Sequence, residues 1–128
     1  MISIGELARR TATKIPTIRY YEQAGLVPAA DRTEGNQRRY GREAVQRLQF
    51  VRHCRELGFS LDDIREMILL DADPDLPCSA IHGIAESQLA AVRARISRLK
   101  SLERELTRIL ALPHDASSGQ CAVITNLV

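Results

Sequence analysis

Tryptophan is absent from this 128-residue chain, and aromatic residues make up only 4% of it. Glycine is also scarce, at 7 residues. β-Sandwiches and barrels depend on aromatic strands and glycine-containing turns, so the composition favours helices. Hydrophobic residues at 45% and charged residues at 27% are typical of a folded globular protein, and the length suits one domain with a core.

Long apolar runs are absent as well. No segment approaches the roughly 18 to 20 apolar residues that a membrane-spanning helix needs. The opening MISIGELARR shows none of the features of a secretory signal. The three cysteines, Cys54, Cys78 and Cys121, are odd in number and too scattered for a disulfide framework. We therefore expect a reduced, cytoplasmic protein without membrane contact.

The chain also lacks the residue patterns that carry enzymatic turnover. It has three histidines, no glycine-rich phosphate loop and no Ser/His/Asp constellation. We therefore expect a protein that is not an enzyme.

The net charge of +2 hides an asymmetry between the two halves of the chain. Residues 1–60 hold 11 lysines and arginines against 6 acidic residues, whereas residues 61–128 hold 7 against 10. A basic half of this kind indicates contact with nucleic acid. The acidic half needs a different role.

Two short helices are predicted within the first 25 residues. Ser3 and Glu6 fit a capping box, in which Ser3 accepts from the Glu6 N–H and the Glu6 carboxylate reaches back. A second helix is expected after Thr13, with Pro16 in its first turn and Gly25 just past its end. This arrangement is a helix-turn-helix candidate, although many helical hairpins bind no DNA.

A small basic hairpin is predicted next. Residues 31–36 are polar and lie between short apolar pieces, and Gly35-Asn36 can adopt positive φ. A hairpin in this place is the layout of a wing. Further helices are expected over about residues 42–57 and from residue 61 onward, after Ser60.

The second half of the chain predicts a hinge and one long helix. Residues 71–78 contain two prolines and three aspartates, whereas residues 79–112 contain no proline. Apolar residues recur there every three or four positions, at Val92, Ile96, Leu99, Leu102 or Glu103, Leu106, and Ile109 or Leu110. A helix of roughly 50 Å cannot bury this stripe within so small a protein. An antiparallel coiled-coil dimer is the simplest solution, and a helix that folds back on its own domain is the alternative.

Five motifs carry a family resemblance: Ile4-Gly5-Glu6-Leu7-Ala8, Thr17-Ile18-Arg19-Tyr20-Tyr21-Glu22, Gly25-Leu26, Arg38-Arg39-Tyr40 and Gly58-Phe59-Ser60-Leu61. On these motifs the chain resembles the MerR family of transcriptional regulators, from residue 2 to about residue 112 and more weakly to its end. The resemblance implies a mainly α fold. Its parts are a winged helix-turn-helix DNA-binding domain over 1–70, a hinge over 71–78, a long antiparallel coiled-coil dimerisation helix over 79–112, and an effector loop with a short tail over 113–128.

The same resemblance implies a mechanism. A homodimer binds a pseudo-palindrome inside an overlong promoter spacer. Effector binding then makes the dimer bend and untwist the DNA, so that RNA polymerase can read both promoter elements.

The residues suggest how such a protein holds DNA. The second helix offers hydroxyls and a guanidinium to phosphates and base edges through Thr17, Arg19, Tyr20 and Tyr21. The hairpin offers Arg32, Asn36, Arg38, Arg39 and Tyr40 to the flanking backbone, and Arg55 adds a phosphate contact. Core packing is the alternative for Tyr20, and a solvated hairpin face is the alternative for Arg38 and Arg39.

The resemblance also implies a metal site. The metal-sensing branch uses a cysteine at the start of the dimer helix and two ligands in a short C-terminal loop. Cys78, His114 and Cys121 stand at these places, although the first loop ligand is usually cysteine. His82 follows Cys78 by one helical turn and is a candidate fourth ligand. Thiolates and imidazole favour a divalent ion, zinc first and cadmium or cobalt next.

Three alternatives remain open for what the chain senses. Cys54, beside Arg52 and Arg55, could be a thiol that reacts with oxidants or aldehydes if its pKa were depressed. Related copper(I) sensors typically carry serine where Cys78 stands, which favours a divalent ion over copper(I). A DNA-binding adaptor without an effector is the third alternative.

Overall fold

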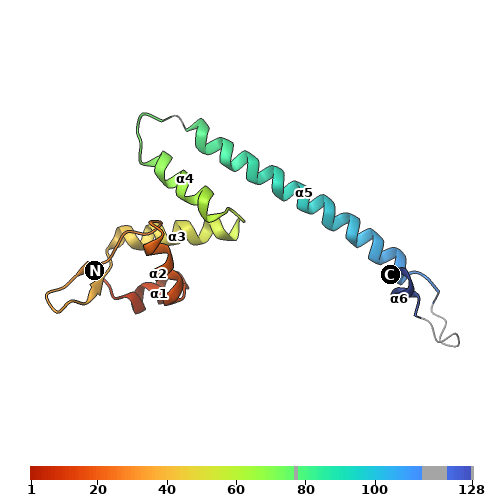
Figure 1. The fold of residues 1–128 in the computed structure, drawn as a ribbon, viewed down its shortest axis with the longest axis horizontal. Coiled ribbons are helices and arrows are strands. Elements are labelled where there is room, and N and C mark those ends of the chain that lie inside the picture. Colours follow the sequence, from red (N-terminus) through yellow and green to blue (C-terminus); the bar gives the residue numbers. More distant parts are fainter. Residues whose placement is uncertain (77, 114–120, 128) are drawn as a thin grey trace. The chain divides into compact units, whose positions relative to one another are not determined.

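The protein is mainly helical, as the composition predicts. The computed structural model describes residues 1–76, 78–113 and 121–127 (Figure 1). In chain order its elements are α1 (Ile4–Thr11), α2 (Ile15–Gln23), β1 (Asp31–Arg32), β2 (Arg38–Arg39), α3 (Arg42–Glu56), α4 (Leu61–Asp71), α5 (Ser79–Leu110) and α6 (Ala122–Leu127). Within the described part of the chain, no helix combines the length and the apolar character that a membrane crossing requires.

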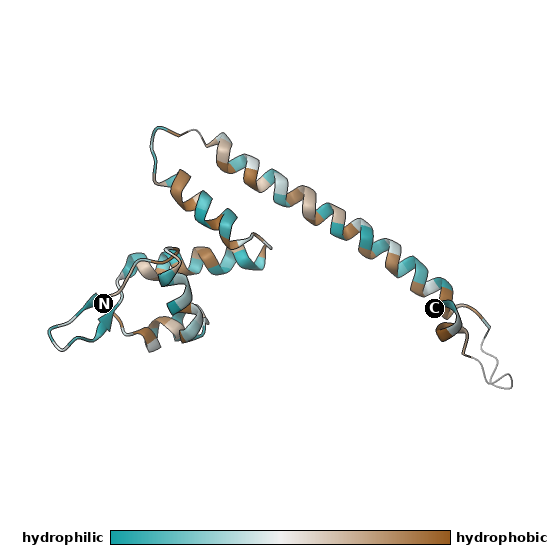
Figure 2. Cartoon of the chain, viewed as in Figure 1, coloured by the Kyte–Doolittle hydropathy of each residue, from teal (hydrophilic) through white to brown (hydrophobic). Residues whose placement is uncertain are grey.

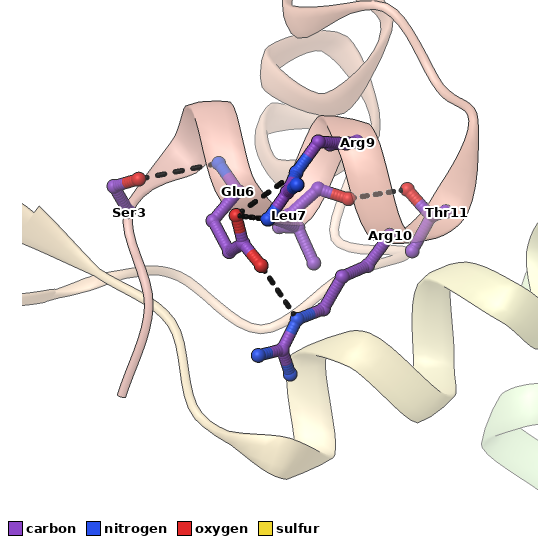
Figure 3. Close-up of polar contacts among 6 residues, drawn as sticks. All are labelled: Ser3, Glu6, Leu7, Arg9, Arg10 and Thr11. Carbon is purple, nitrogen blue, oxygen red and sulfur yellow. Dashed lines mark hydrogen bonds and ion pairs between the residues drawn. The ribbon is translucent and has the colours of Figure 1, made fainter.

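Helix α1 begins at the predicted N-cap, Ser3, but only one of the two hydrogen bonds of the predicted capping box is present. Ser3 Oγ accepts from the Glu6 N–H at 3.2 Å. The Glu6 carboxylate, expected to reach back, instead accepts from Arg9 and from Arg10 Nε (Figure 3). Two guanidiniums on the next turn attract the carboxylate more strongly than a neutral N–H does, and they hold the Glu6 pKa below its usual range. Thr11, at the end of the helix, is buried and donates to the Leu7 carbonyl at 2.7 Å.

Helix α2 follows after a tight turn, which confirms the helix-turn-helix. Pro16 stands in its first turn, where a missing N–H costs no hydrogen bond. Gly25 follows the end of the helix with a φ of +78°, as its expected place beyond the helix requires. The chain then turns inward, and Leu26 and Val27 are buried.

The predicted hairpin is present and is called the wing below (residues 31–39). Its strands pair antiparallel, Asp31 with Arg39 and Arg32 with Arg38. In the turn, Asn36 has a positive φ of 62°, whereas the φ of Gly35 is not positive. Figure 1 shows the wing extending beyond the helices of the first unit.

Two clusters of buried side chains form the core of the first four helices. One comprises Leu7, Ile18, Val27, Tyr40, Ala44 and Leu48, and joins α1, α2, α3 and the end of the wing. The other comprises Leu26, Val51, Cys54, Phe59, Ile64 and Met67, and joins α3 to α4. Tyr21 packs against both clusters, so the two cores meet at α2.

The chain forms two compact units, Met1–Ala85 and Glu86–Val128. The first two turns of α5 belong to the first unit because Ile81 and Ile84 pack against the second cluster. By contacts the division therefore falls inside α5, after the hinge predicted over 71–78.

Helix α5 is one continuous helix of 32 residues. Figure 2 shows hydrophobic residues recurring along it among hydrophilic ones. The large apolar side chains of this stripe are 45–73% exposed in the single chain, namely Leu89, Ile96, Leu99, Leu102, Leu106 and Leu110. Ile109 differs, since it is 1% exposed.

Candidate functional site

The outer side of α2 presents a polar, cationic surface. Arg19 is exposed, and Tyr20 is 56% exposed, so core packing does not account for this tyrosine. Thr17 and Tyr21 are half buried, and Tyr21 is also part of the packing between the two core clusters. The Tyr20 and Tyr21 rings lie 6.1 Å apart, tilted by 56°. The guanidinium of Arg19 and the phenol of Tyr20 are thus available on the exposed side of α2, while Thr17 and Tyr21 line a separate hollow.

The wing adds further cations. Arg32 and Arg38 are exposed and Arg39 is half buried. Arg32 Nη1 donates to Asn36 Oδ1 at 3.0 Å, which braces the turn. One surface hollow is lined by Arg19 and Arg38, together with Glu22 and Gln23. Helix α2 and the wing therefore present a cation each at the same place.

Tyr40 is the one predicted DNA contact that the structure contradicts. Its side chain is 1% exposed and lies in the first core cluster. Its hydroxyl donates to Glu22 Oε2 at 2.8 Å. Burial and the neighbouring carboxylate raise the pKa of this phenol. The end of the wing must be covered to hold its strands in place, and Tyr40 fills that need.

A second hollow, of about 400 Å³, lies between the α1–α2 turn and the end of α3. Arg55 lines it, as do Thr17 and Tyr21. Lys14, the N-cap residue of α2, and Arg52 of α3 also line it, and neither was among the predicted contacts. Arg52 comes beside α2 only through the packing of α3, which no local pattern shows. Arg55 Nη1 donates to the Phe59 carbonyl at 2.8 Å, which fixes its guanidinium at the rim.

Sequence reasoning also missed Glu22, whose carboxylate joins α2 to both ends of the wing. Glu22 Oε1 accepts from the Ala30 N–H at 2.9 Å, and Oε2 accepts from Tyr40. On the other side of α2, Arg65 of α4 donates from Nε and Nη2 to the Ala24 carbonyl, at 3.3 and 3.2 Å. The last turn of α2 is thus held by the wing and by α4.

Two of the predicted metal ligands are exposed, free thiols. Cys78 directly precedes α5, and its carbonyl accepts from the His82 N–H at 3.0 Å. The side chain of His82 is exposed. Cys121 directly precedes α6, where the Ile124 and Val123 backbone N–H groups lower the pKa of its thiol. His114 lies outside the described residues. Among residues 1–76, 78–113 and 121–127, no three His, Cys, Asp or Glu side chains gather as a metal site would require.

Cys54 has the opposite environment. It is 6% exposed in the second core cluster, and burial raises the pKa of its thiol. The neighbouring guanidiniums do not activate it, since Arg52 pairs with Glu56 and Arg55 bonds to Phe59. The structure therefore contradicts the low-pKa thiol that oxidant or aldehyde sensing through Cys54 would need.

Comparison with known proteins gives two family matches. The family of MerR helix-turn-helix regulatory proteins matches residues 2–70, and the family described as MerR, DNA binding matches residues 45–109. The two matches together span the helix-turn-helix, the wing, α3, α4 and nearly all of α5.

Individual relatives agree with the family matches. The transcriptional regulator ZntR of Escherichia coli is 44% identical over 120 residues, covering 93% of this chain and 82% of ZntR. The mercuric resistance operon regulatory protein of Serratia marcescens is 34% identical, covering 98% of this chain and 87% of its own. The crystal structure of PbrR691 from Ralstonia metallidurans in complex with lead(II) covers both chains fully, with a TM-score of 0.84 and 35% identity. The chain therefore belongs to the MerR family, and is a DNA-binding transcriptional regulator rather than an enzyme.

Proposed function

We propose that the chain is a metal-responsive transcriptional regulator that binds a promoter pseudo-palindrome as a homodimer. The observation that carries this proposal is the pairing of Arg19 and Arg38 at one hollow between α2 and the wing, in a chain with two exposed thiols. Relatives named for mercuric resistance or solved with lead(II) support a thiophilic ion as the effector.

DNA contact is assigned by exposure and charge. We propose that Arg19, Tyr20 and Thr17 of α2 reach phosphates and base edges, with Tyr21 in a supporting position. The wing residues Arg32, Asn36, Arg38 and Arg39 then contact the flanking backbone. Arg55 and Lys14 supply further phosphate contacts from the second hollow.

The dimer is assigned to α5. Leu89, Val92, Ile96, Leu99, Leu106 and Leu110 follow alternating steps of four and three, with Glu103 at the one polar position of this register. A sustained register of this kind is what two packed helices need. The exposed stripe on the single chain supports a second copy as its cover.

The metal ligands proposed are Cys78, His114 and Cys121, with His82 as a candidate fourth. The donor chemistry fits, because Cys121 sits where backbone N–H groups favour its thiolate and Cys78 is exposed. When bound, a divalent ion would join thiolates and imidazole in one coordination shell. Zinc suits this donor set best, with cadmium or cobalt next.

The length of α5 supports a site shared between two protomers. Cys78 stands before the first residue of α5 and Cys121 follows its last residue by 11 positions. At 1.5 Å per residue, a continuous helix of this length separates its ends by about 48 Å. In an antiparallel dimer, the start of one α5 lies beside the end of the other. Cys78 of one protomer then meets Cys121 of its partner.

Transcription would respond through DNA shape. We propose that ligation biases the dimer toward an arrangement that distorts the promoter, so that RNA polymerase reads both of its elements. The protein then acts on promoter DNA in the cytoplasm.

Metal titration of the purified, reduced protein tests this function. We expect about one divalent ion per chain and a tetrahedral Co²⁺ spectrum with thiolate charge-transfer bands. Cys78→Ser and Cys121→Ser should each abolish tight binding, and His114→Ala should weaken it. Cys54→Ala is the matched control, because it removes a buried thiol and should leave stoichiometry and spectrum unchanged.

Other results would contradict the proposal in distinct ways. Tight binding of Cu⁺ alone would identify a copper(I) sensor. Binding of no metal, with promoter DNA still bound, would identify an adaptor without an effector. Loss of metal binding in Cys54→Ala but not in Cys121→Ser would place the site at Cys54 instead of at the ends of α5.

A further inference from the structure

The carboxylate of Glu22 touches the wing at both of its ends. Ala30, which donates its N–H to Oε1 at 2.9 Å, directly precedes β1. Tyr40, which donates its hydroxyl to Oε2 at 2.8 Å, directly follows β2. One side chain in the last turn of α2 thus bonds to both flanks of the hairpin.

Apart from Glu22, the wing is anchored by the apolar packing of Tyr40 and Ala30 in the first core cluster, which is less directional than a hydrogen bond. Its strands are two residues long, and a hairpin of that size is not stable by itself. The Tyr40 backbone also pairs with Ile2, through two bonds of 2.8 Å, but this bridge ties the wing to the N-terminus and not to α2. Charge-assisted bonds to a carboxylate are stronger than such neutral bonds.

We propose that Glu22 is a positioning residue that fixes the wing relative to α2 and so sets the span between their contacts on DNA. Glu22 does not itself need to touch DNA. The cations that depend on it are Arg38 on the wing and Arg19 on α2, which line one hollow with it. This inference rests on the proposed DNA-binding function.

The consequence is a selectivity for DNA shape. If the wing and α2 are held at a fixed span, the dimer favours duplexes whose groove and flanking backbone match that span. Without Glu22 the two elements bind independently, and the flanking contacts lose their register.

The test compares full-length variants on an operator that the wild-type protein selects from randomised duplex DNA. For Glu22→Ala we expect loss of hydroxyl-radical protection at the flanking positions, with protection at the α2 positions retained. Affinity should fall by about tenfold, and the dependence of log K on log salt should become shallower, because wing phosphates are no longer neutralised.

Three further variants separate positioning from folding. Glu22→Gln retains an acceptor for Ala30 and a donor for Tyr40, so it should restore the flanking protection. Tyr40→Phe removes one of the two bonds and should weaken that protection in part, which keeps the test valid if Glu22→Ala does not fold. Glu66→Ala removes the same charge from the exposed surface of α4 and should behave as wild type.

Two results would overturn the inference. Full flanking protection in Glu22→Ala would show that the wing is held without Glu22. Uniform weakening at all positions with an unchanged salt slope would show a loss of folded protein alone. If the wild-type protein selects no sequence, the proposed DNA-binding function fails, and the inference with it.

Discussion

The two units of the chain bury their apolar residues in different ways. Residues 1–85 hold both core clusters, and their helices cover one another. Over the described residues from 86 onward, Ile109 is the only large apolar side chain that is fully buried, while Leu99 and Leu110 are 62% and 73% exposed. The first unit buries most of its apolar pattern within one chain, although Leu57 and Leu69 stay exposed, whereas the second leaves most of its pattern uncovered.

This difference separates two kinds of information in one sequence. The pattern of the first unit specifies a tertiary fold. The pattern of α5 specifies an association, because a single helix has no second face against which to bury its stripe. Changes in the two units should therefore affect different measurements.

The largest effect is expected from Leu99→Glu. Each Leu buried in a dimer contributes about 1.5–3 kcal/mol, and the substitution occurs once in each protomer. A carboxylate placed on the stripe adds a desolvation cost. We expect the dimer dissociation constant to rise by about a hundredfold or more, measured by analytical ultracentrifugation. The helix-turn-helix unit should keep its thermal unfolding transition.

A matched substitution sets the control for this experiment. Ser101→Glu introduces the same charge on the same helix, away from the stripe and beside Arg104, and should leave the dimer intact. Dissociation by both variants to the same degree would mean that charge on α5, and not burial of Leu99, governs association.

Leu48→Ala should have the converse effect. Leu48 is fully buried in the first cluster, so its truncation should lower the free energy of unfolding of the first unit by about 2–5 kcal/mol. Chemical denaturation followed by far-UV circular dichroism measures this loss. The dimer should persist by ultracentrifugation, and a monomeric Leu48→Ala would break the comparison between the units.

A smaller effect is expected from Arg65→Ala, which removes the two bonds to the Ala24 carbonyl. Because these bonds are long and partly exposed to solvent, we expect a loss of about 1 kcal/mol in the stability of the first unit. Asp62→Asn removes only the ion pair with Arg65 at 3.3 Å and should cost less than about 0.5 kcal/mol. Equal losses in the two variants would assign the effect to the ion pair.

Much of the fold could be predicted because its signals are local. The Ser3 cap, Pro16 and the glycine after α2 act within one helical turn, and the α5 periodicity is a property of one helix. Such features depend on residues that are close in sequence, so they can be predicted before the packing of the chain is known.

The remainder depended on contacts between distant residues. By its chemistry alone, Tyr40 could be a DNA contact or a core residue. Only the packing of the residues that follow β2 shows that it belongs to the core. The bonds of Glu22 to Tyr40 and of Arg65 to Ala24 span 18 and 41 positions. No local sequence pattern indicates such pairs. The sequence therefore predicted which side chains α2 offers to DNA, but not the contacts of Glu22 and Arg65 that hold the helix in place.

The smallest predicted effect contrasts the same side chain in the two units. Cys54 is buried in the first and its thiol pKa is raised, whereas Cys121 is exposed in the second and its pKa is lowered. In the metal-free protein, Cys121 should thus become a thiolate at a lower pH than an ordinary thiol, and Cys54 at a higher pH. Alkylation by iodoacetamide, followed residue by residue by mass spectrometry, should show Cys121 reacting several-fold faster than Cys54 near neutral pH.

The metal then sharpens this contrast. Added Zn²⁺ should protect Cys121 and Cys78 from alkylation and leave the slow rate at Cys54 unchanged. Lowering the pH should remove the protection, since protons compete for the thiolates. Rapid labelling of Cys54 would contradict its burial, and its protection by Zn²⁺ would contradict the assignment of the metal to Cys78 and Cys121. Protection of Cys78 and Cys121 alone would instead support two separate arrangements. The DNA-binding helices fold within one chain, whereas the metal site needs residues of two protomers.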